Sequence, residues 1–203
     1  MRWGATATPT SSSIGRPDEF AADLARSLAA IGRALGQPGA LLGYRAPGFS
    51  LTARTLWALD ILRAQGIRYD SSLQPITRRG NGAYGASRFA TRLNAGLWEF
   101  PVSTVRLAGW NCPVAGGAYF RLLPLWVTRR PIDRINAEGR PAVLYLHPWE
   151  MDPGEPDVPG APLPARARHP LNLGRTEARL RSLLGERAFG PLCEVFAAEL
   201  GQG

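Results

Sequence analysis

Hydrophobic residues recur at helical spacing in the first well-patterned stretch of the chain, Pro17–Leu35. One stripe of a helix with 3.6 residues per turn would carry the apolar residues Phe20, Leu24, Leu28, Ile31 and Leu35. Pro17 suits the first turn because its missing N–H has no partner there, and Asp18 and Glu19 place negative charge at the positive end of the helix dipole. Gly36 ends the pattern. The spacing therefore predicts an amphipathic helix.

A strand, a helix and a second strand are predicted to follow within about thirty residues. Ala40–Tyr44 is a short apolar run typical of a buried strand, and Ile67–Tyr69 is another. Between them, Thr52 can cap a helix that ends near Gly66. This order is the βαβ unit of a parallel sheet.

The alternation continues to the end of the patterned region. The remaining sequence predicts, in order, a long loop over 74–94, a strand over Leu97–Val105, a helix over about Leu122–Ala137, a buried strand over Ala142–Leu146, a proline-rich loop over Met151–Pro164 and a helix over Thr176–Leu184. Pro101 inside the first of these strands indicates an edge or a bulge. The pattern as a whole predicts an α/β fold, with a barrel as one form of it.

Composition supports one domain in a reducing compartment. The chain has 203 residues, 45% of them hydrophobic and 20% charged, which suits a single core. No apolar run is long enough to cross a bilayer, and Met1–Gly15 lacks the apolar region of a signal peptide. Cys112 and Cys193 have neither metal-ligand nor disulfide-scaffold spacing, so we expect idle thiols and a cytoplasmic protein.

Charge raises nucleic acid as a partner, but its distribution argues against one. The formal net charge is +8 and all 24 basic residues are arginine. They are scattered, with only the doublets Arg78-Arg79 and Arg129-Arg130, and they form no basic helix face. We therefore interpret them as a solvated surface and expect no nucleic-acid partner, with an anionic glycan or a membrane surface left open.

Three polar side chains follow predicted strand ends, where α/β folds gather their active sites. Arg45 could orient a carboxylate or a ligand, and Asp70 could pair with it. His147 follows the buried run at 142–146, and histidine serves as a general acid or base near neutral pH. Each also has a structural interpretation, as a surface arginine, a turn aspartate and a buried histidine. His169 lies in a Pro/Arg-rich stretch and is interpreted as a surface residue.

Six strings in this order resemble the NodB-type polysaccharide deacetylases. They are Gly43-Tyr44-Arg45-Ala46-Pro47-Gly48-Phe49-Ser50, Tyr69-Asp70-Ser71-Ser72, Leu97-Trp98-Glu99-Phe100-Pro101, Pro113-Val114-Ala115-Gly116-Gly117, Tyr119-Phe120-Arg121-Leu122-Leu123-Pro124 and Tyr145-Leu146-His147-Pro148-Trp149-Glu150. The resemblance runs from about Pro17 to Leu184 and is strongest to the branch found beside exosortase-linked exopolysaccharide loci.

The resemblance implies a distorted (β/α) barrel that hydrolyses N-acetyl groups on a polysaccharide. A divalent metal, zinc by analogy, would activate water in the intact family, held by one aspartate and two histidines. The roles carried over to this chain are proton donation by His147, charge-tuning of the base by Arg45, support of Arg45 by Asp70, and a sugar pocket shaped by Pro47, Phe49 and Trp149.

The metal-binding motifs of that family do not match this chain. Residues 1–16 contain no histidine, and His147 and His169 alone are too few ligands for a metal site. We therefore expect an incomplete barrel over 17–203, a non-family segment over 1–16, and no tightly bound metal. Residues 1–16 can be encoded by codons that, read in a shifted frame, would specify a peptide with the His-x-x-x-His motif. The N-terminal segment could therefore result from a frameshift, from a sequencing error or from genuine divergence.

Three functions follow as hypotheses. The first is a polysaccharide N-deacetylase domain that is inactive in this form, with an N-acetylated polysaccharide as its partner. The second is a carbohydrate-binding or scaffold protein of the same origin that keeps the pocket without catalysis. The third, nucleic-acid binding through arginine, has the least support from the sequence.

Overall fold

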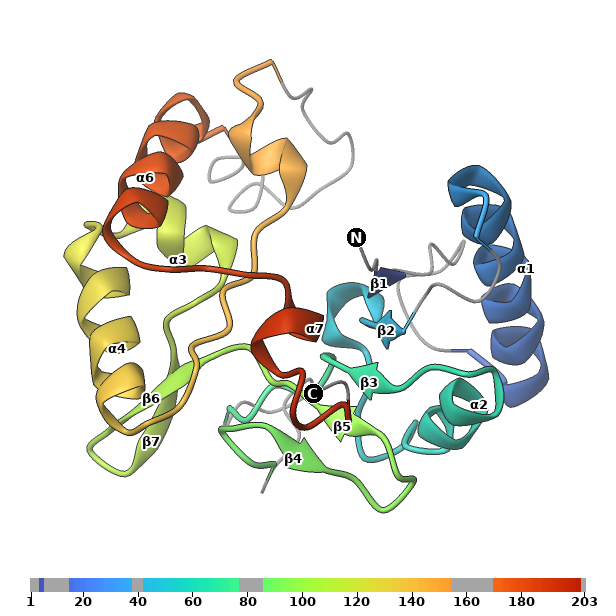
Figure 1. Ribbon diagram of the computed structural model, residues 1–203. Coiled ribbons are helices and arrows are strands. Elements are labelled where there is room, and N and C mark those ends of the chain that lie inside the picture. Colours follow the sequence, from blue (N-terminus) through green and yellow to red (C-terminus); the bar gives the residue numbers. More distant parts are fainter. Residues whose placement is uncertain (1–3, 6–14, 38–41, 77–85, 155–169, 202–203) are drawn as a thin grey trace.

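The chain folds into two halves around a short sheet (Figure 1). The structure is a computed structural model that describes residues 4–5, 15–37, 42–76, 86–154 and 170–201. One half contains β1 (Gly4–Ala5), α1 (Pro17–Leu35), β2 (Gly43–Tyr44), the 3-10 turn η1 (Pro47–Phe49), α2 (Ala58–Ala64), β3 (Tyr69–Asp70), β4 (Thr91–Arg92) and β5 (Trp98–Glu99). The other contains β6 (Thr104–Leu107), β7 (Trp110–Pro113), α3 (Gly117–Leu122), α4 (Trp126–Ala137), the 3-10 turn η2 (Pro148–Met151) and α6 (Leu173–Glu186). The short helix α7 (Leu192–Val195) lies between them.

The larger sheet has the strand order β1-β2-β3-β5-β4, and all neighbours are parallel except β4 and β5. Strands β2 and β3 are joined through α2, so the predicted βαβ unit is confirmed. In their register Gly43 lies opposite Tyr69, and a Cβ at Gly43 would come within 2.1 Å of the Tyr69 ring. Glycine at position 43 therefore lets the tyrosine lie across β2.

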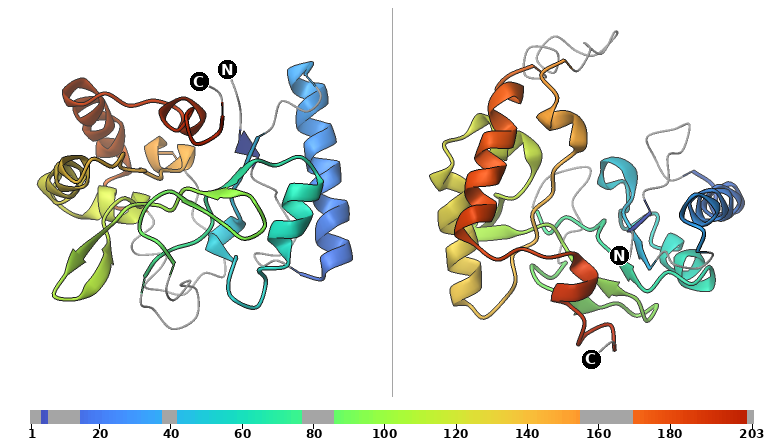
Figure 2. Two further views of the ribbon diagram at one scale, coloured as in Figure 1. Left: turned by 60° about the horizontal axis from the view of Figure 1, so that its bottom comes forward. Right: turned by 45° about the horizontal axis from the view of Figure 1, so that its top comes forward.

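Helices cover both faces of this sheet. On one face, Phe20 and Leu24 of α1 and Leu62 of α2 pack with Tyr44 in one buried cluster. On the other, Phe196 and Leu200 beyond α7, together with Cys193, pack with Tyr69 and Phe100. Figure 2 shows the blue and cyan helices α1 and α2 side by side in both further views. The alternation of strand side chains thus sends Tyr44 and Tyr69 to opposite faces.

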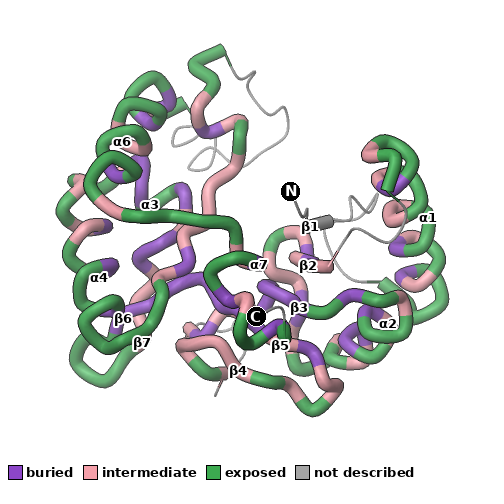
Figure 3. The backbone as a smooth tube through the Cα atoms, in the orientation of Figure 1, coloured by how far each residue is buried: buried purple, intermediate pink, exposed green. Residues whose placement is uncertain are grey.

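The second half is built on the β6–β7 hairpin and three helices. Val105 of β6 packs with Ile135 of α4, and Phe120 of α3 packs with Ile132 of α4 and Leu183 of α6. Figure 3 shows buried positions along β3, β5 and the start of β6, whereas the outer turns of α4 and α6 are exposed. This half supplies the segment 142–151, which carries the predicted histidine.

The α/β prediction is confirmed, but in the described residues the strands form an open sheet and a hairpin, with no closed barrel. The helix Pro17–Leu35 has the predicted bounds, with Gly36 left-handed at its end. Thr52 does not cap the next helix. Instead its backbone N–H donates to Thr55 Oγ1 at 2.8 Å, and turns delay the helix to Ala58.

Two predicted elements are split. The run Leu97–Val105 divides into β5 and β6, as Pro101 suggested. The helix expected over Leu122–Ala137 is interrupted near its start: Leu122 ends α3, Leu123 is extended before Pro124, and α4 begins at Trp126 and continues to Ala137.

The strand predicted over Ala142–Leu146 is wrong. Its only ladder pairing is a bridge between Tyr145 and Gly116. Val143 satisfies its backbone differently, since its N–H donates to Ser103 Oγ and its carbonyl accepts from Ser103 N. The segment is extended and buried at Val143, but a side chain takes the place of a strand neighbour.

Several expectations concern residues that are not described. Arg78-Arg79, His169, residues 77–85 of the first predicted loop and residues 155–164 of the second lie outside the described ranges, as do residues 1–3 and 6–14. In the described part of the loop predicted over 74–94, Thr91–Arg92 forms the strand β4, so the loop prediction is wrong there. Gly4–Ala5 pairs with β2 as a parallel strand at the edge of the sheet. Of the helices that the structure describes, none has the length and apolar character to cross a membrane.

Candidate functional site

Arg45 follows β2 and lies above the end of β3. Its Nε donates to the Ser71 carbonyl at 2.8 Å, and its Nη2 donates to the Ser71 hydroxyl. Its guanidinium carbon lies 4.5 Å from the centre of the Tyr145 ring, a cation–π contact. Burial lowers the pKa of Arg45 from its ordinary value, and the neighbouring Tyr145, Asp70 and Glu99 oppose this shift.

The expected ion pair between Arg45 and Asp70 does not form. Tyr44 is level with Asp70 in the parallel register, so Arg45 is level with Ser71. Because successive strand side chains point to opposite faces, Asp70 points away from Arg45. Asp70 instead accepts from the hydroxyl and the backbone N–H of Ser72, whose hydroxyl accepts from Ala46 N at 2.7 Å. It therefore supports the Arg45 strand from the far face.

Asp70 also faces a second buried carboxyl group. Glu99 is its register partner on β5, and the two residues are 0% and 1% exposed. Burial raises the pKa of Asp70, and burial together with the Asp70 charge raises the pKa of Glu99 well above its usual range. Each of these two carboxyl groups disfavours ionisation of the other, so we expect them to share one proton. Glu99 Oε2 has no hydrogen-bond partner among the described residues.

His147 ends the extended segment on the opposite side of the site. Tyr145 is fixed by its backbone N–H, which donates to the Ala115 carbonyl at 2.8 Å. The Tyr145 hydroxyl hydrogen-bonds His147 Nε2, and the imidazole stacks near the Trp149 ring with centroids 5.9 Å apart. Arg45, Tyr145, His147 and Trp149 thus form a continuous row of contacts.

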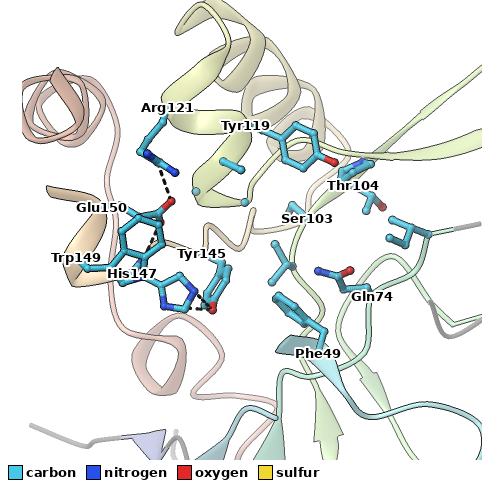
Figure 4. Close-up of a pocket in the computed structure, with 16 residues that line it drawn as sticks. Phe49, Gln74, Ser103, Thr104, Tyr119, Arg121, Tyr145, His147, Trp149 and Glu150 are labelled. Atoms are coloured by element: carbon cyan, nitrogen blue, oxygen red, sulfur yellow. Dashed lines mark hydrogen bonds and ion pairs between the residues drawn. The ribbon is translucent and has the colours of Figure 1, made fainter. Parts of the chain in front are cut away.

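Two cavities adjoin this row. The arginine cavity, about 540 Å³, is lined by Arg45, Pro47, Tyr69, Ser71, Tyr145 and His147 among others. The aromatic cavity, about 300 Å³, is lined by Phe49, Gln74, Tyr119, Tyr145, His147 and Trp149 among others (Figure 4). Tyr145 and His147 line both cavities. The prediction that Arg45 and His147 face one cavity is confirmed, and Asp70 lines neither.

Phe49 is held in a conformation that non-glycine residues rarely adopt. Its φ is 55°, in the left-handed region, and its ring meets Tyr145 edge-on at 5.1 Å. Such strain is concentrated at ligand sites, where packing holds the residue in place. Phe49 and Trp149 line the aromatic cavity, and Pro47 lines the arginine cavity. Their role in a sugar pocket stays a prediction.

Sequence reasoning assigned no role to three buried charged residues of this site. They are Glu99, Arg121 and Glu150, which are 1%, 4% and 2% exposed. One of them carried a usable signal. Glu150 stands three residues after His147, the spacing at which a side chain returns to the backbone N–H of a turn.

The described residues do not fit the metal that the resemblance implies. Nowhere in the described ranges do three His, Cys, Asp or Glu side chains group as metal ligands. Asp70 and Glu99 are buried and line neither cavity, so they are not available as ligands there.

A sequence profile of the family described as "Domain of unknown function (DUF3473)" matches residues 71–197. The match includes Ser71, Tyr145, His147 and Trp149, and it begins after Arg45 and Phe49. No curated protein and no solved structure matches the chain.

Proposed function

The chain belongs to the DUF3473 family, and we propose that it binds an N-acetylated polysaccharide at the proton-donating part of an N-deacetylase site. The family description assigns no activity. The proposal rests on the motif resemblance and on one observation: Arg45 and His147, predicted from separate strand ends, line the same cavity and are linked through Tyr145.

The chemistry of amide hydrolysis matches these side chains. Water adds to the acetyl carbon, the C–N bond breaks, and the departing nitrogen requires a proton. His147 and Tyr145 are titratable side chains that line both cavities, and in this proposal the imidazole of His147 supplies that proton. Arg45 keeps a permanent positive charge beside the site, which favours the negative charge that develops on the carbonyl oxygen.

The aromatic cavity suits a sugar ring. Phe49, Tyr145 and Trp149 present aromatic surface, and Gln74 and Tyr119 add an amide and a hydroxyl group at its edge. A pocket of mostly apolar walls with a few polar groups is typical of small-ligand sites. In this proposal the sugar ring lies in the aromatic cavity and its acetamido group reaches the imidazole of His147.

Water activation is the part of the reaction that these residues do not supply. The intact family uses a metal for it by analogy, and the described ranges hold no grouped ligand set. We therefore propose that the 203-residue chain binds the glycan without hydrolysing it. The same observation favours the second candidate, a non-catalytic carbohydrate-binding protein that derives from the same family.

Binding and acetate release separate these possibilities. The chain is titrated calorimetrically with an N-acetylglucosamine tetrasaccharide and with its de-N-acetylated form, and acetate is measured with and without Zn²⁺. We expect the acetylated form to bind more tightly and no acetate to appear. Trp149→Ala should weaken binding about tenfold or more, whereas Trp110→Ala, at an exposed position on β7, should not.

Each result has a distinct meaning. Zn²⁺-dependent acetate release would show a complete deacetylase and contradict the inactive form. Failure to bind either tetrasaccharide would contradict both candidates. If the acetylated and de-N-acetylated tetrasaccharides bound with equal affinity, the site would not recognise the acetyl group.

A further inference from the structure

Glu150 connects two parts of the second half from a fully buried position. Its Oε1 accepts from Arg121 Nε at 3.1 Å, and its Oε2 accepts from the backbone N–H of His147 at 2.8 Å (Figure 4). One carboxylate therefore joins helix α3 to the residue that carries the imidazole. Both charged partners are buried, at 2% and 4% exposure.

The space for this carboxylate comes from a single glycine. A Cβ at Gly117, the first residue of α3, would lie 1.8 Å from Glu150 Oε2 and 2.1 Å from Oε1. Because the backbone fixes the position of a Cβ atom, no side-chain rotation can relieve these contacts. Any side chain at position 117 must therefore displace the carboxylate and, with it, the N–H of His147.

The same ion pair reaches the aromatic cavity. The guanidinium carbon of Arg121 lies 5.1 Å from the centre of the Trp149 ring, and Arg121 Nη1 donates to the Leu171 carbonyl at 3.0 Å. Arg121 is thus held between the segment before α6 and the indole. Moving Glu150 would change the surroundings of Trp149 as well as those of His147.

A buried ion pair adds little net stability, because desolvation of two charges offsets their attraction. Its better-attested effect is to specify one geometry, since removal of either partner leaves a buried charge without compensation. Here the geometry that it specifies is that of His147 and Trp149, two residues that line the aromatic cavity.

We propose that Glu150 is a positioning residue of this site: with Arg121 and Gly117 it fixes where His147 and Trp149 lie at the aromatic cavity. Its action is through those two residues, since its own carboxylate is fully engaged. The consequence for the ligand rests on the proposed function, because it assumes that a sugar ring occupies this cavity. The placement of His147 does not depend on that assumption.

The test uses the full chain with isotope-labelled histidine. The protein has two histidines, so its imidazole NMR spectrum has two sets of signals, which a His169→Gln variant assigns. The test variants are Gly117→Ala and Glu150→Gln. Gly185→Ala, at an open helical position in α6, and Glu177→Gln, at an exposed ion pair in α6, are the matched controls. Binding of the N-acetylated tetrasaccharide is measured on the same samples.

We expect both test variants to move the His147 signals and to weaken tetrasaccharide binding about tenfold, with no such change in the controls. Unchanged His147 signals in a folded Glu150→Gln protein would overturn the proposal. So would loss of folding in both test variants with intact controls, because Glu150 would then hold the fold and not the site. If no variant and no parent protein binds the sugar, the proposed function fails, while the His147 signals still decide the role of Glu150.

Discussion

The two sides of the site are held in different ways. The arginine side, Arg45 with Ser71, Asp70 and Glu99, stands on three parallel strands whose backbones pair in register. The histidine side, residues 145–150, has one bridge to Gly116 and depends on side-chain bonds from Tyr145 and Glu150. On the arginine side, the paired strands fix the side chains through many backbone hydrogen bonds. On the histidine side, the position of residues 145–150 depends on a few side-chain groups.

This difference suggests how each side responds to substitution. On the arginine side, a change that separates β2 from β3 should affect the whole fold, and removal of one polar group should affect it less. On the histidine side, removal of the Tyr145 hydroxyl should move His147 with a small effect on stability, whereas breaking the buried Arg121–Glu150 pair should also destabilise the fold. The following expectations run from the largest effect to the smallest.

Gly43→Ala should be the most damaging of these changes. Its Cβ would overlap the Tyr69 ring across β2 and β3, and overpacking of this kind costs about 3 kcal/mol. Urea unfolding of the variant should show this loss. Gly185→Ala, where nothing lies within 4 Å, should instead gain about 0.5–1 kcal/mol from helix propensity. A fully stable Gly43→Ala protein would mean that Tyr69 does not cross β2 as described.

Glu99→Gln should change how stability depends on pH. The folded protein holds the Glu99 proton more tightly than the unfolded chain, so stability falls as pH rises above the ordinary value near 4.5 and up to the raised folded pKa. Each unit of that interval corresponds to about 1.4 kcal/mol. The variant should lose most of this slope in unfolding experiments across pH, and Glu177→Gln should keep it. Equal slopes in all three proteins would argue against a shared proton.

Tyr145→Phe should have the smallest effect on stability, about 1 kcal/mol for one hydrogen bond. It removes the hydroxyl that contacts His147 and keeps the ring beneath Arg45 and beside Phe49. The NMR signals of His147 should move while the backbone amide of Ser71 stays in place. If only the Ser71 amide signal moved, the Tyr145 hydroxyl would position the arginine side and not His147.

Local sequence predicted the parts that local physics determines. The helix from Pro17 to Leu35 has its apolar stripe, its proline start and its glycine end within its own residues, and its bounds are those predicted. The βαβ unit followed from the order of apolar runs. The segment 142–146 was predicted wrongly because an apolar run does not reveal its partner, and Ser103 supplies through its side chain what a strand would supply through its backbone.

The candidate site shows the same limit. Arg45 and His147 were both predicted at strand ends, and both line the arginine cavity, but the segment before His147 is not a strand of the sheet. The predicted ion pair between Arg45 and Asp70 is wrong because it depends on the register of β2 and β3. A difference of one residue in that register sends the two side chains to opposite faces of the sheet. Arg121 gave no signal in the sequence, since only the folded chain places it beside Glu150.

Backbone NMR of the labelled protein, titrated with the N-acetylglucosamine tetrasaccharide, tests whether the two sides form one ligand site. We predict that the amides of Ser71 and His147 shift together with one affinity, that Trp110 at the far hairpin does not shift, and that the de-N-acetylated tetrasaccharide moves His147 much less. Shifts on one side only, or shifts of Ser71 and His147 with two different affinities, would contradict a single glycan site.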